Sequence, residues 1–342
     1  MKAFFLQYKK GSRWILWLCF HLFFLVEIAS AAPISLTDMA NRKIILLQPA
    51  KRIVSITPAN TMCVLVLGLE DRLIAVDHET QKNPIALAIR PDLAKLHIAG
   101  KSNTFFFETL LPMKPDLVIL SARKDGLITA KRLQKMGIPA VIIHLETFEK
   151  VNTSIRLIAK ATGTEKRGEF VCRTLQNTLQ KAQKGVQHIP ANKRKKVYYA
   201  GPSHFFSVPS GSLLQTDMIQ KAGGISVSQN LVGYFQTISP EQFIQWKPDI
   251  ILVNTRTKDQ IPSILAQPQY KTIPAVQHKA IYVFPDTQAY WDFPSPLAAL
   301  GVLWAAYQLY PEQFSHIPFE KEANQVYRAF FNLSWPVKDS AS

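Results

Sequence analysis

Two glutamates and two arginines recur at matching places in a segment that the chain carries twice. The copies are FETLLPMKPDLVILSAR and PEQFIQWKPDIILVNTR, and their alignment pairs Glu108 with Glu241 and Arg123 with Arg256. Carboxylates form directional, charge-assisted hydrogen bonds with arginines, whereas guanidinium groups bind anions. The repeat therefore predicts two sets of charged groups, each set occupying equivalent places in two similar units.

Each copy of the repeat has the pattern of a short helix, a Lys-Pro-Asp turn and a buried strand. Proline stops the helix, and the apolar run that follows enters a sheet. Ligands of open parallel sheets bind beyond the carboxyl ends of the strands. Arg123 and Arg256 lie beyond these strands, so we predict that they face each other across a cleft and favour an anion. Lys101 follows another expected strand and adds a third positive charge.

The surrounding sequence alternates short apolar strands with helices, which is typical of an α/β fold with parallel sheets. This alternation stops between residues 148 and 186, where two helical stretches follow each other. We therefore predict two Rossmann-like lobes with central parallel sheets, joined by one long backbone helix, with a ligand cleft between the lobes. The expected boundaries are 32–161 for the N-terminal lobe, 162–190 for the linking helix and 191–342 for the C-terminal lobe.

The first 31 residues have the pattern of a cleavable signal peptide. A basic head, MKAFFLQYKKGSR, precedes the apolar run WILWLCFHLFFLV and the small-residue site Ala29-Ser30-Ala31. The alternative, a membrane anchor, requires a longer apolar run. The net charge of +16 suits nucleic acid, an anionic membrane face or an anionic small ligand. Export and the scattered distribution of the basic residues argue against nucleic acid.

Several motifs in a fixed order resemble those of a known family. They are RIVSITPANT, the two copies of the repeat, GSLLQTDMIQKAGG and WDFPSPLAALGVLW. On these motifs the chain resembles the helix-linked (class III) periplasmic substrate-binding proteins of ABC importers for ferric siderophores, haem and cobalamin. The resemblance covers nearly the whole chain after residue 31, and it implies a periplasmic location.

The resemblance also implies a role for the repeated glutamates. In relatives an exposed glutamate at the tip of each lobe docks onto arginines of the inner-membrane permease, and Glu108 and Glu241 match these positions. The alternative is that each glutamate only favours a helix start electrostatically. The chain departs from the family at Met62 and Cys63, where relatives often have a glutamate after the loop Asn-Thr. We expect Asn60 or Thr61 to cap the helix there.

The predicted ligand site combines the strand ends with the aromatic side chains of the second-lobe loops, on which a flat or apolar cargo would pack. For each aromatic residue the alternative is ordinary core packing. We expect no cofactor and no direct metal ligand, and Tyr290 or His204 are the candidates if iron is ligated directly. The candidate ligand-binding residues are Thr57, Asn60, Lys101, Arg123, Tyr199, His204, Tyr234, Arg256, Tyr290 and Trp291.

These observations predict a monomeric receptor that captures an anionic metal complex, a ferric siderophore or haem, and delivers it to an ABC permease. Cobalamin or a metal oxyanion such as molybdate is the alternative cargo, since arginines and loop amides suit an oxyanion. A remote alternative is an exported α/β hydrolase. The sequence has no G-x-S-x-G elbow, P-loop or G-x-G-x-x-G fingerprint, so we expect no enzyme.

Overall fold

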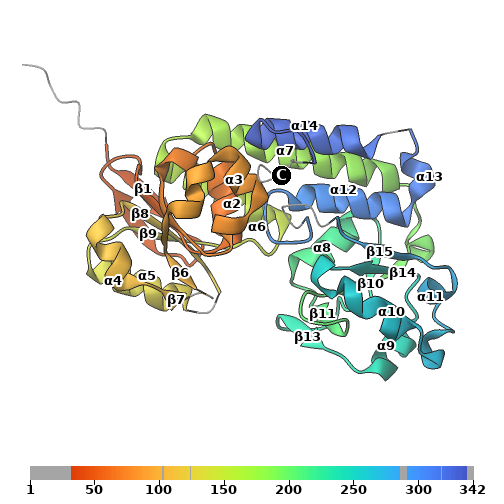
Figure 1. Cartoon of the computed structure of the whole chain (residues 1–342). Coiled ribbons are helices and arrows are strands. Elements are labelled where there is room, and N and C mark those ends of the chain that lie inside the picture. The colour runs from red at the N-terminus through yellow and green to blue at the C-terminus, as the bar shows by residue number, and fades with distance from the viewer. Residues whose placement is uncertain (1–31, 102–103, 124, 286–290, 317, 337–342) are drawn as a thin grey trace, which may run out of the picture.

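The computed structural model describes residues 32–101, 104–123, 125–285, 291–316 and 318–336. It confirms the predicted α/β class, because the described chain forms two lobes, each with a central parallel sheet (Figure 1). The predicted signal peptide and Tyr290 lie outside the described residues, as does the side chain of Lys101.

The N-terminal lobe is built on a five-stranded sheet with the order β5-β4-β3-β8-β9, in which every neighbouring pair is parallel. Every residue of β3, β8 and β9 is buried except Ser121 at the end of β8, which explains their continuous apolar runs. The strands of this sheet are β3 (Ile53–Ser55), β4 (Leu73–Val76), β5 (His97–Ile98), β8 (Leu117–Ser121) and β9 (Ala140–Ile143). Two further pairs are antiparallel: β1 (Ile34–Thr37) pairs with β2 (Lys43–Leu46), and β6 (Gly100–Lys101) pairs with β7 (Thr104–Phe105). The helices are α2 (Pro58–Val66), α3 (Pro84–Ile89), α4 (Phe107–Leu110) and α5 (Gly126–Lys135).

The start of α2 differs from the prediction that Asn60 or Thr61 caps this helix. Thr57 is the N-cap residue, and its side chain accepts a hydrogen bond from the backbone N–H of Asn60 at 3.3 Å. The earlier start follows from Pro58, because proline is favoured in the first turn, where its missing N–H has no helical partner. Met62 and Cys63 consequently lie inside the helix and are buried.

The C-terminal lobe repeats this plan with a four-stranded parallel sheet of order β12-β10-β14-β15. Beside it lies the antiparallel pair of β11 (Ser207–Pro209) and β13 (Phe235–Thr237). The sheet strands are β10 (Lys196–Ala200), β12 (Ile225–Ser226), β14 (Ile250–Val253) and β15 (Ile281–Val283). The helices are α8 (Leu214–Lys221), α9 (Pro240–Trp246), α10 (Ile261–Leu265), α11 (Pro274–Gln277), α12 (Ala298–Leu309), α13 (Pro311–Phe314) and α14 (Phe319–Phe331).

The Lys-Pro-Asp turn has the same structure in both copies of the repeat. Lys114 and Lys247 have left-handed backbone conformations, with φ of 47° and 45°, that end the preceding helical turns. Asp116 accepts hydrogen bonds from two backbone N–H groups immediately before β3, and Asp249 accepts one from the start of β10. Each turn is therefore fixed to the neighbouring strand of its own sheet.

Two consecutive helices, α6 (Phe148–Thr162) and α7 (Glu165–Val186), connect the lobes. In Figure 1, α7 and α14 run next to each other along the side where both lobes meet. The guanidinium of Arg167 in α7 donates hydrogen bonds to the carbonyl oxygens of Val66 in α2, at 2.9 Å, and Phe330 in α14, at 2.7 Å. The C-terminal helix thus returns to the N-terminal lobe.

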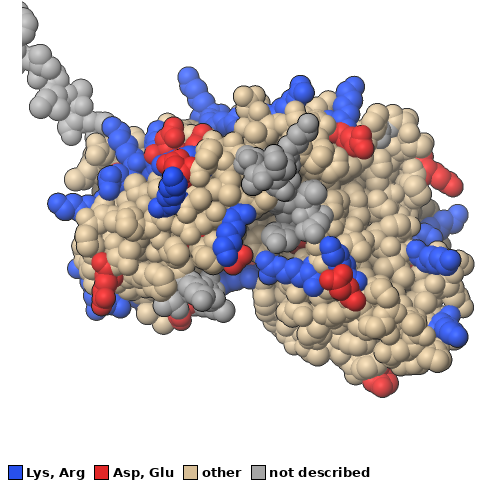
Figure 2. Space-filling model, viewed as in Figure 1, with Lys and Arg blue, Asp and Glu red and all other residues tan. Residues whose placement is uncertain are grey.

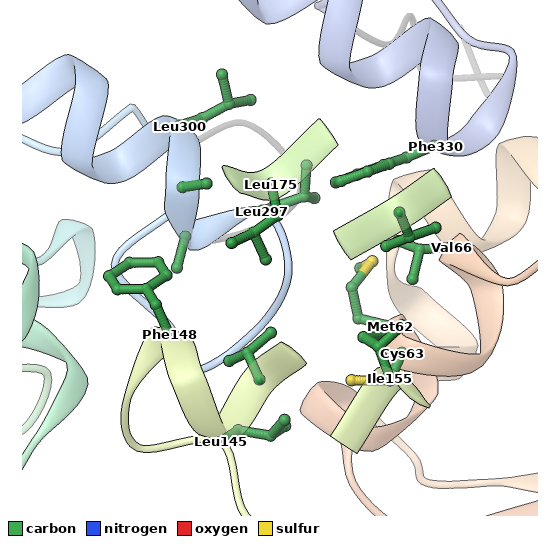
Figure 3. Close-up of a cluster of buried hydrophobic side chains, with 14 of the residues drawn as sticks. Met62, Cys63, Val66, Leu145, Phe148, Ile155, Leu175, Leu297, Leu300 and Phe330 are labelled. Carbon is green, nitrogen blue, oxygen red and sulfur yellow. The ribbon is translucent and has the colours of Figure 1, made fainter. Parts of the chain in front are cut away.

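One apolar core extends through both lobes and the linking helices. Figure 3 shows part of this core, with side chains from α2, α6, α12 and α14 packed around Leu175 of α7. None of the helices in the described part of the chain has the length and apolar character that a membrane span requires.

Candidate ligand-binding site

A small pocket lies at the carboxyl ends of β10 and β14 in the C-terminal lobe, where the open-sheet rule places ligands. Its cavity volume is about 60 Å³. The polar side chains that line it are Tyr199, Gln215, Tyr234, Asn254, Arg256 and Asp292.

Asp292 is the central polar group of this pocket. Its side chain is almost completely buried, with 2% of the residue exposed. The Tyr199 hydroxyl donates a hydrogen bond to Asp292 Oδ2 at 2.6 Å, and Asn254 Nδ2 donates to the same oxygen at 2.8 Å. Burial raises the pKa of Asp292, although these two hydrogen bonds and the charge of Arg256 act in the opposite direction. The pocket therefore has an acidic group at its base.

Gln215 in the first turn of α8 supplies a second acceptor. Its Nε2 donates a hydrogen bond to the backbone oxygen of Asp292 at 2.8 Å. A carbonyl oxygen can only accept, so this bond fixes which end of the amide faces Asp292. Gln215 Oε1 is buried and accepts no hydrogen bond from any residue that the structure describes.

Arg256 supplies positive charge at the same pocket. It lies just beyond β14, and its backbone N–H donates to Asn254 Oδ1 at 3.0 Å. The residue is exposed and lines the cavity. An anion that enters the pocket can therefore meet the guanidinium of Arg256.

Arg123 reaches the rim of this pocket from the other lobe. Its guanidinium carbon Cζ lies 3.9 Å from the ring centre of Tyr234, which is a cation–π geometry. The guanidinium also forms an ion pair with Glu146, which follows β9. Burial raises the pKa of Glu146, whereas the charge of Arg123 lowers it. Arg123 thus connects the N-terminal lobe to Tyr234 of the C-terminal lobe, and its positive charge is paired with the carboxylate of Glu146.

The other candidates occupy different places. Asn60 is buried in the N-terminal lobe, where its Nδ2 donates to the backbone oxygen of Ile119 at 3.2 Å. Thr57 caps α2, as described above. His204 is partly buried, and its Nε2 lies 3.3 Å from the Thr237 hydroxyl. Of the ten predicted ligand residues, Tyr199, Tyr234 and Arg256 line the pocket and Arg123 contacts its rim.

Trp291 belongs to the core, which corrects the expectation that its ring faces the cleft. Only 1% of the residue is exposed. Its indole N–H donates to the Tyr327 hydroxyl at 3.2 Å, and its ring packs against Phe319 and Trp335. The cause is the turn before α12, which directs Trp291 inward and places the next residue, Asp292, at the pocket.

Sequence reasoning missed Gln215, Asp292 and Glu146. Glu146 could have been found, because it follows the carboxyl end of β9 and the strand-end rule applies there too. Asp292 lies in the motif WDFPSP, but only the three-dimensional contacts show that it, and not its aromatic neighbour, faces the pocket. Within the described residues, no three His, Cys, Asp or Glu side chains come together as a metal site.

The two repeated glutamates lie on α4 and α9, which contribute no residue to the lining of the pocket. Both Glu108 and Glu241 are exposed. Figure 2 shows acidic side chains at the outer ends of both lobes, in the regions of α4 and α9, and lysines and arginines scattered over the visible face. The pKa of Glu241 is lowered, first by its own backbone N–H and then by the Ser239 side chain, which is consistent with a carboxylate at a helix start.

Two parallel-sheet lobes, a long linking helix and a pocket at the strand ends define a helix-linked substrate-binding protein. The sequence profile described as "Periplasmic binding protein" matches residues 53–287. The chain belongs to this family, whose helix-linked members serve ABC importers and catalyse no reaction.

Individual relatives extend the similarity over most of the chain. The molybdate-binding protein MolA of Haemophilus influenzae is 26% identical over 331 residues, which cover 90% of this chain and 93% of MolA. The structure of MolA bound to molybdate has a TM-score of 0.77 at 24% identity, over 89% of this chain and 99% of that one. The periplasmic haem-binding protein RhuT of Roseiflexus sp. RS-1 has a TM-score of 0.63 at 21% identity, over 77% of this chain and 99% of RhuT.

Proposed function

We propose that the protein is an importer receptor whose cargo is a small oxyanion, of the chemical class to which molybdate belongs. The observation that carries this proposal is the size of the pocket beside Arg256. Sites for drug-sized ligands have volumes of about 300–1,000 Å³, whereas this cavity measures about 60 Å³. A haem or a siderophore is too large for such a space, but a tetrahedral oxyanion needs little more than the volume of a few water molecules.

Charge and similarity support the same cargo class. Arg256 lines the pocket and Arg123 lies over Tyr234 at its rim, so an anion could meet guanidinium groups from both lobes. The relative that is 26% identical over 90% of this chain is named for binding molybdate.

A ferric siderophore or haem remains the second candidate, favoured by the aromatic side chains around the pocket. Tyr234 and Phe293 are 44% and 40% exposed and line the cavity. If the contact between Arg123 and Tyr234 opened, the lobes could separate and these rings could pack against a flat cargo.

The repeated glutamates suit a docking role at the membrane. One exposed carboxylate on each lobe, Glu108 on α4 and Glu241 on α9, could pair with permease arginines and report the relative position of the lobes. Residues 1–31 would direct export to the periplasm, where this encounter takes place.

The cargo class can be decided with protein purified without refolding. We expect titration with molybdate and with sulfate to give saturable heat signals, and titration with haem to give no Soret shift. Elemental analysis of the purified protein checks for co-purified molybdenum and iron. A coloured iron complex or a haem spectrum, together with absent oxyanion binding, would overturn the oxyanion proposal and support the second candidate.

A further inference from the structure

The base of the pocket is rich in hydrogen-bond acceptors. Asp292 contributes a buried carboxylate, and Gln215 contributes a buried Oε1 that accepts from no described residue. The Asn254 amide nitrogen donates to Asp292 Oδ2 at 2.8 Å and to the Tyr199 oxygen at 3.4 Å. The Tyr199 proton is likewise directed at Asp292. The donors of Tyr199 and Asn254 are therefore already used, whereas acceptor capacity remains at the base.

The rim of the pocket has the opposite character. Arg256 is positively charged and lines the same cavity. A cargo that fits both parts needs negative charge for the rim and a hydrogen-bond donor for the base. A fully deprotonated oxyanion has only acceptors, so it would meet the oxygens of Asp292 and Gln215 without a proton between them, and unmet buried acceptors disfavour binding.

We propose that Asp292 and Gln215 form an acceptor subsite that selects an oxyanion carrying a hydroxyl group, such as hydrogen phosphate or hydrogen arsenate. This inference rests on the proposed oxyanion function. The cargo hydroxyl donates to the acceptor subsite, and the remaining oxygens of the cargo face Arg256. The single hydroxyl proton of the cargo then lies between a cargo oxygen and the acceptor subsite, and the guanidinium of Arg256 faces the negative charge of the cargo.

An oxyanion without a hydroxyl can bind at the same place only if Asp292 takes up a proton from solvent. The carboxyl group then donates to the anion, and the complex holds one proton more than the separated partners. Among the described residues, the titratable or charged groups that act on Asp292 are Tyr199 of β10 and Arg256 beyond β14, and α8 presents the uncharged amide of Gln215. The affinity for such an anion should increase as the pH falls, by about tenfold per pH unit where one proton is taken up.

The test compares dianions of matched shape and charge by calorimetry at a pH just above neutrality. The pairs are hydrogen phosphate with sulfate, and hydrogen arsenate with molybdate. The wild-type protein should bind the hydroxyl-bearing member of each pair at least about tenfold more tightly. Sulfate affinity should also increase with falling pH in the wild type and should lose this dependence in Asp292→Asn.

Asp292→Asn keeps an oxygen that accepts from Tyr199 and Asn254 and adds an amide donor toward the pocket. It should reduce or reverse the preference within each pair. Asp259→Asn, an exposed change in the same lobe, is its matched control.

Gln215→Met removes the second acceptor and should also reduce the preference. Gln220→Met, a change of an exposed residue of α8, is its control. The Gln215 variant keeps the test valid if Asp292→Asn does not fold.

The outcomes separate this inference from the function on which it rests. Oxyanion binding with equal affinity inside each pair, or a preference that survives both pocket variants, would overturn the acceptor subsite and leave the oxyanion function intact. Absence of binding for all four anions would overturn the oxyanion function, and the acceptor subsite with it.

Discussion

Each arginine near the pocket has an acidic neighbour, but the two arrangements differ. The guanidinium of Arg123 forms a direct ion pair with Glu146 and stacks on Tyr234. Arg256 influences Asp292 through its charge, while the hydrogen bonds to that carboxylate come from Tyr199 and Asn254. An anion at Arg123 must therefore compete with a direct ion pair, whereas Arg256 lines the pocket itself.

This difference predicts unequal effects of two alanine substitutions. Arg256→Ala should weaken oxyanion binding by about 1.5–3 kcal/mol, the usual contribution of a hydrogen bond that involves a charged group. Arg123→Ala should weaken binding less, because an anion must compete with Glu146 for that guanidinium. Calorimetry measures both, and Lys271→Ala, an exposed change in the same lobe, is the control. Equal affinity of Arg256→Ala and the control would show that Arg256 does not hold cargo.

The candidate residues show which parts of a site can be predicted from sequence. Arg123 and Arg256 were found because a repeated strand fixed their position relative to a sheet edge. In the loop before α12, no periodic pattern tells which side chain faces inward. Trp291 lies in the core, whereas its sequence neighbour Asp292 lines the pocket. Because both aromatic and polar side chains occur in ligand sites, residue type alone does not tell which of the two faces the pocket.

At the scale of elements, the repeated helix, turn and strand were predictable because local chemistry determines them. Proline ends the helix, the preceding lysine adopts a left-handed conformation, and the aspartate binds backbone N–H groups of the neighbouring strand. The start of α2 was harder to predict. Thr57, Asn60 and Thr61 are all good caps by residue type, and the backbone conformation selects Thr57.

The two helices that carry the repeated glutamates in their first turns lead to a prediction about transport. Glu108→Lys together with Glu241→Lys should abolish cargo uptake, because each reversed charge would repel a permease arginine. Cargo affinity should remain unchanged, because α4 and α9 contribute no residue to the pocket. Uptake into vesicles that contain the permease, measured beside calorimetry of the isolated receptor, separates the two effects.

A matched control for this prediction reverses charge elsewhere on each lobe. Glu70→Lys lies in the N-terminal lobe, and Glu312→Lys lies in α13 of the C-terminal lobe; Glu312 is exposed. This pair should leave uptake close to the wild-type rate. Normal uptake by the Glu108 and Glu241 double variant would contradict docking, and the two carboxylates would then be explained by helix-start electrostatics alone.

At the scale of the whole molecule, the two lobes share their core and are not independent units. The sequence indicated a division at the linking helix, because the strand pattern restarts beyond it. It could not indicate that α14, the last helix of the chain, packs against α7 and against α2 of the N-terminal lobe. Such a contact depends on apolar surfaces that match although they are far apart in the chain. Figure 3 shows Phe330 of α14 beside Val66 of α2.

Arg167 offers a test of this connection between the lobes. Its guanidinium donates to carbonyl oxygens near the C-terminal ends of α2 and α14, where a positive charge also interacts favourably with the helix dipoles. Arg167→Met should lower the free energy of unfolding by about 2–4 kcal/mol, because two charge-assisted hydrogen bonds are lost while the apolar stem is kept. It should also speed amide hydrogen exchange in α14 more than in the sheet of the C-terminal lobe. Urea unfolding and exchange measured by mass spectrometry check both effects, with Lys166→Met, an exposed change one residue earlier on α7, as the control. If the two variants unfold at the same urea concentration, the connection through Arg167 contributes nothing measurable and the shared apolar core alone joins the lobes.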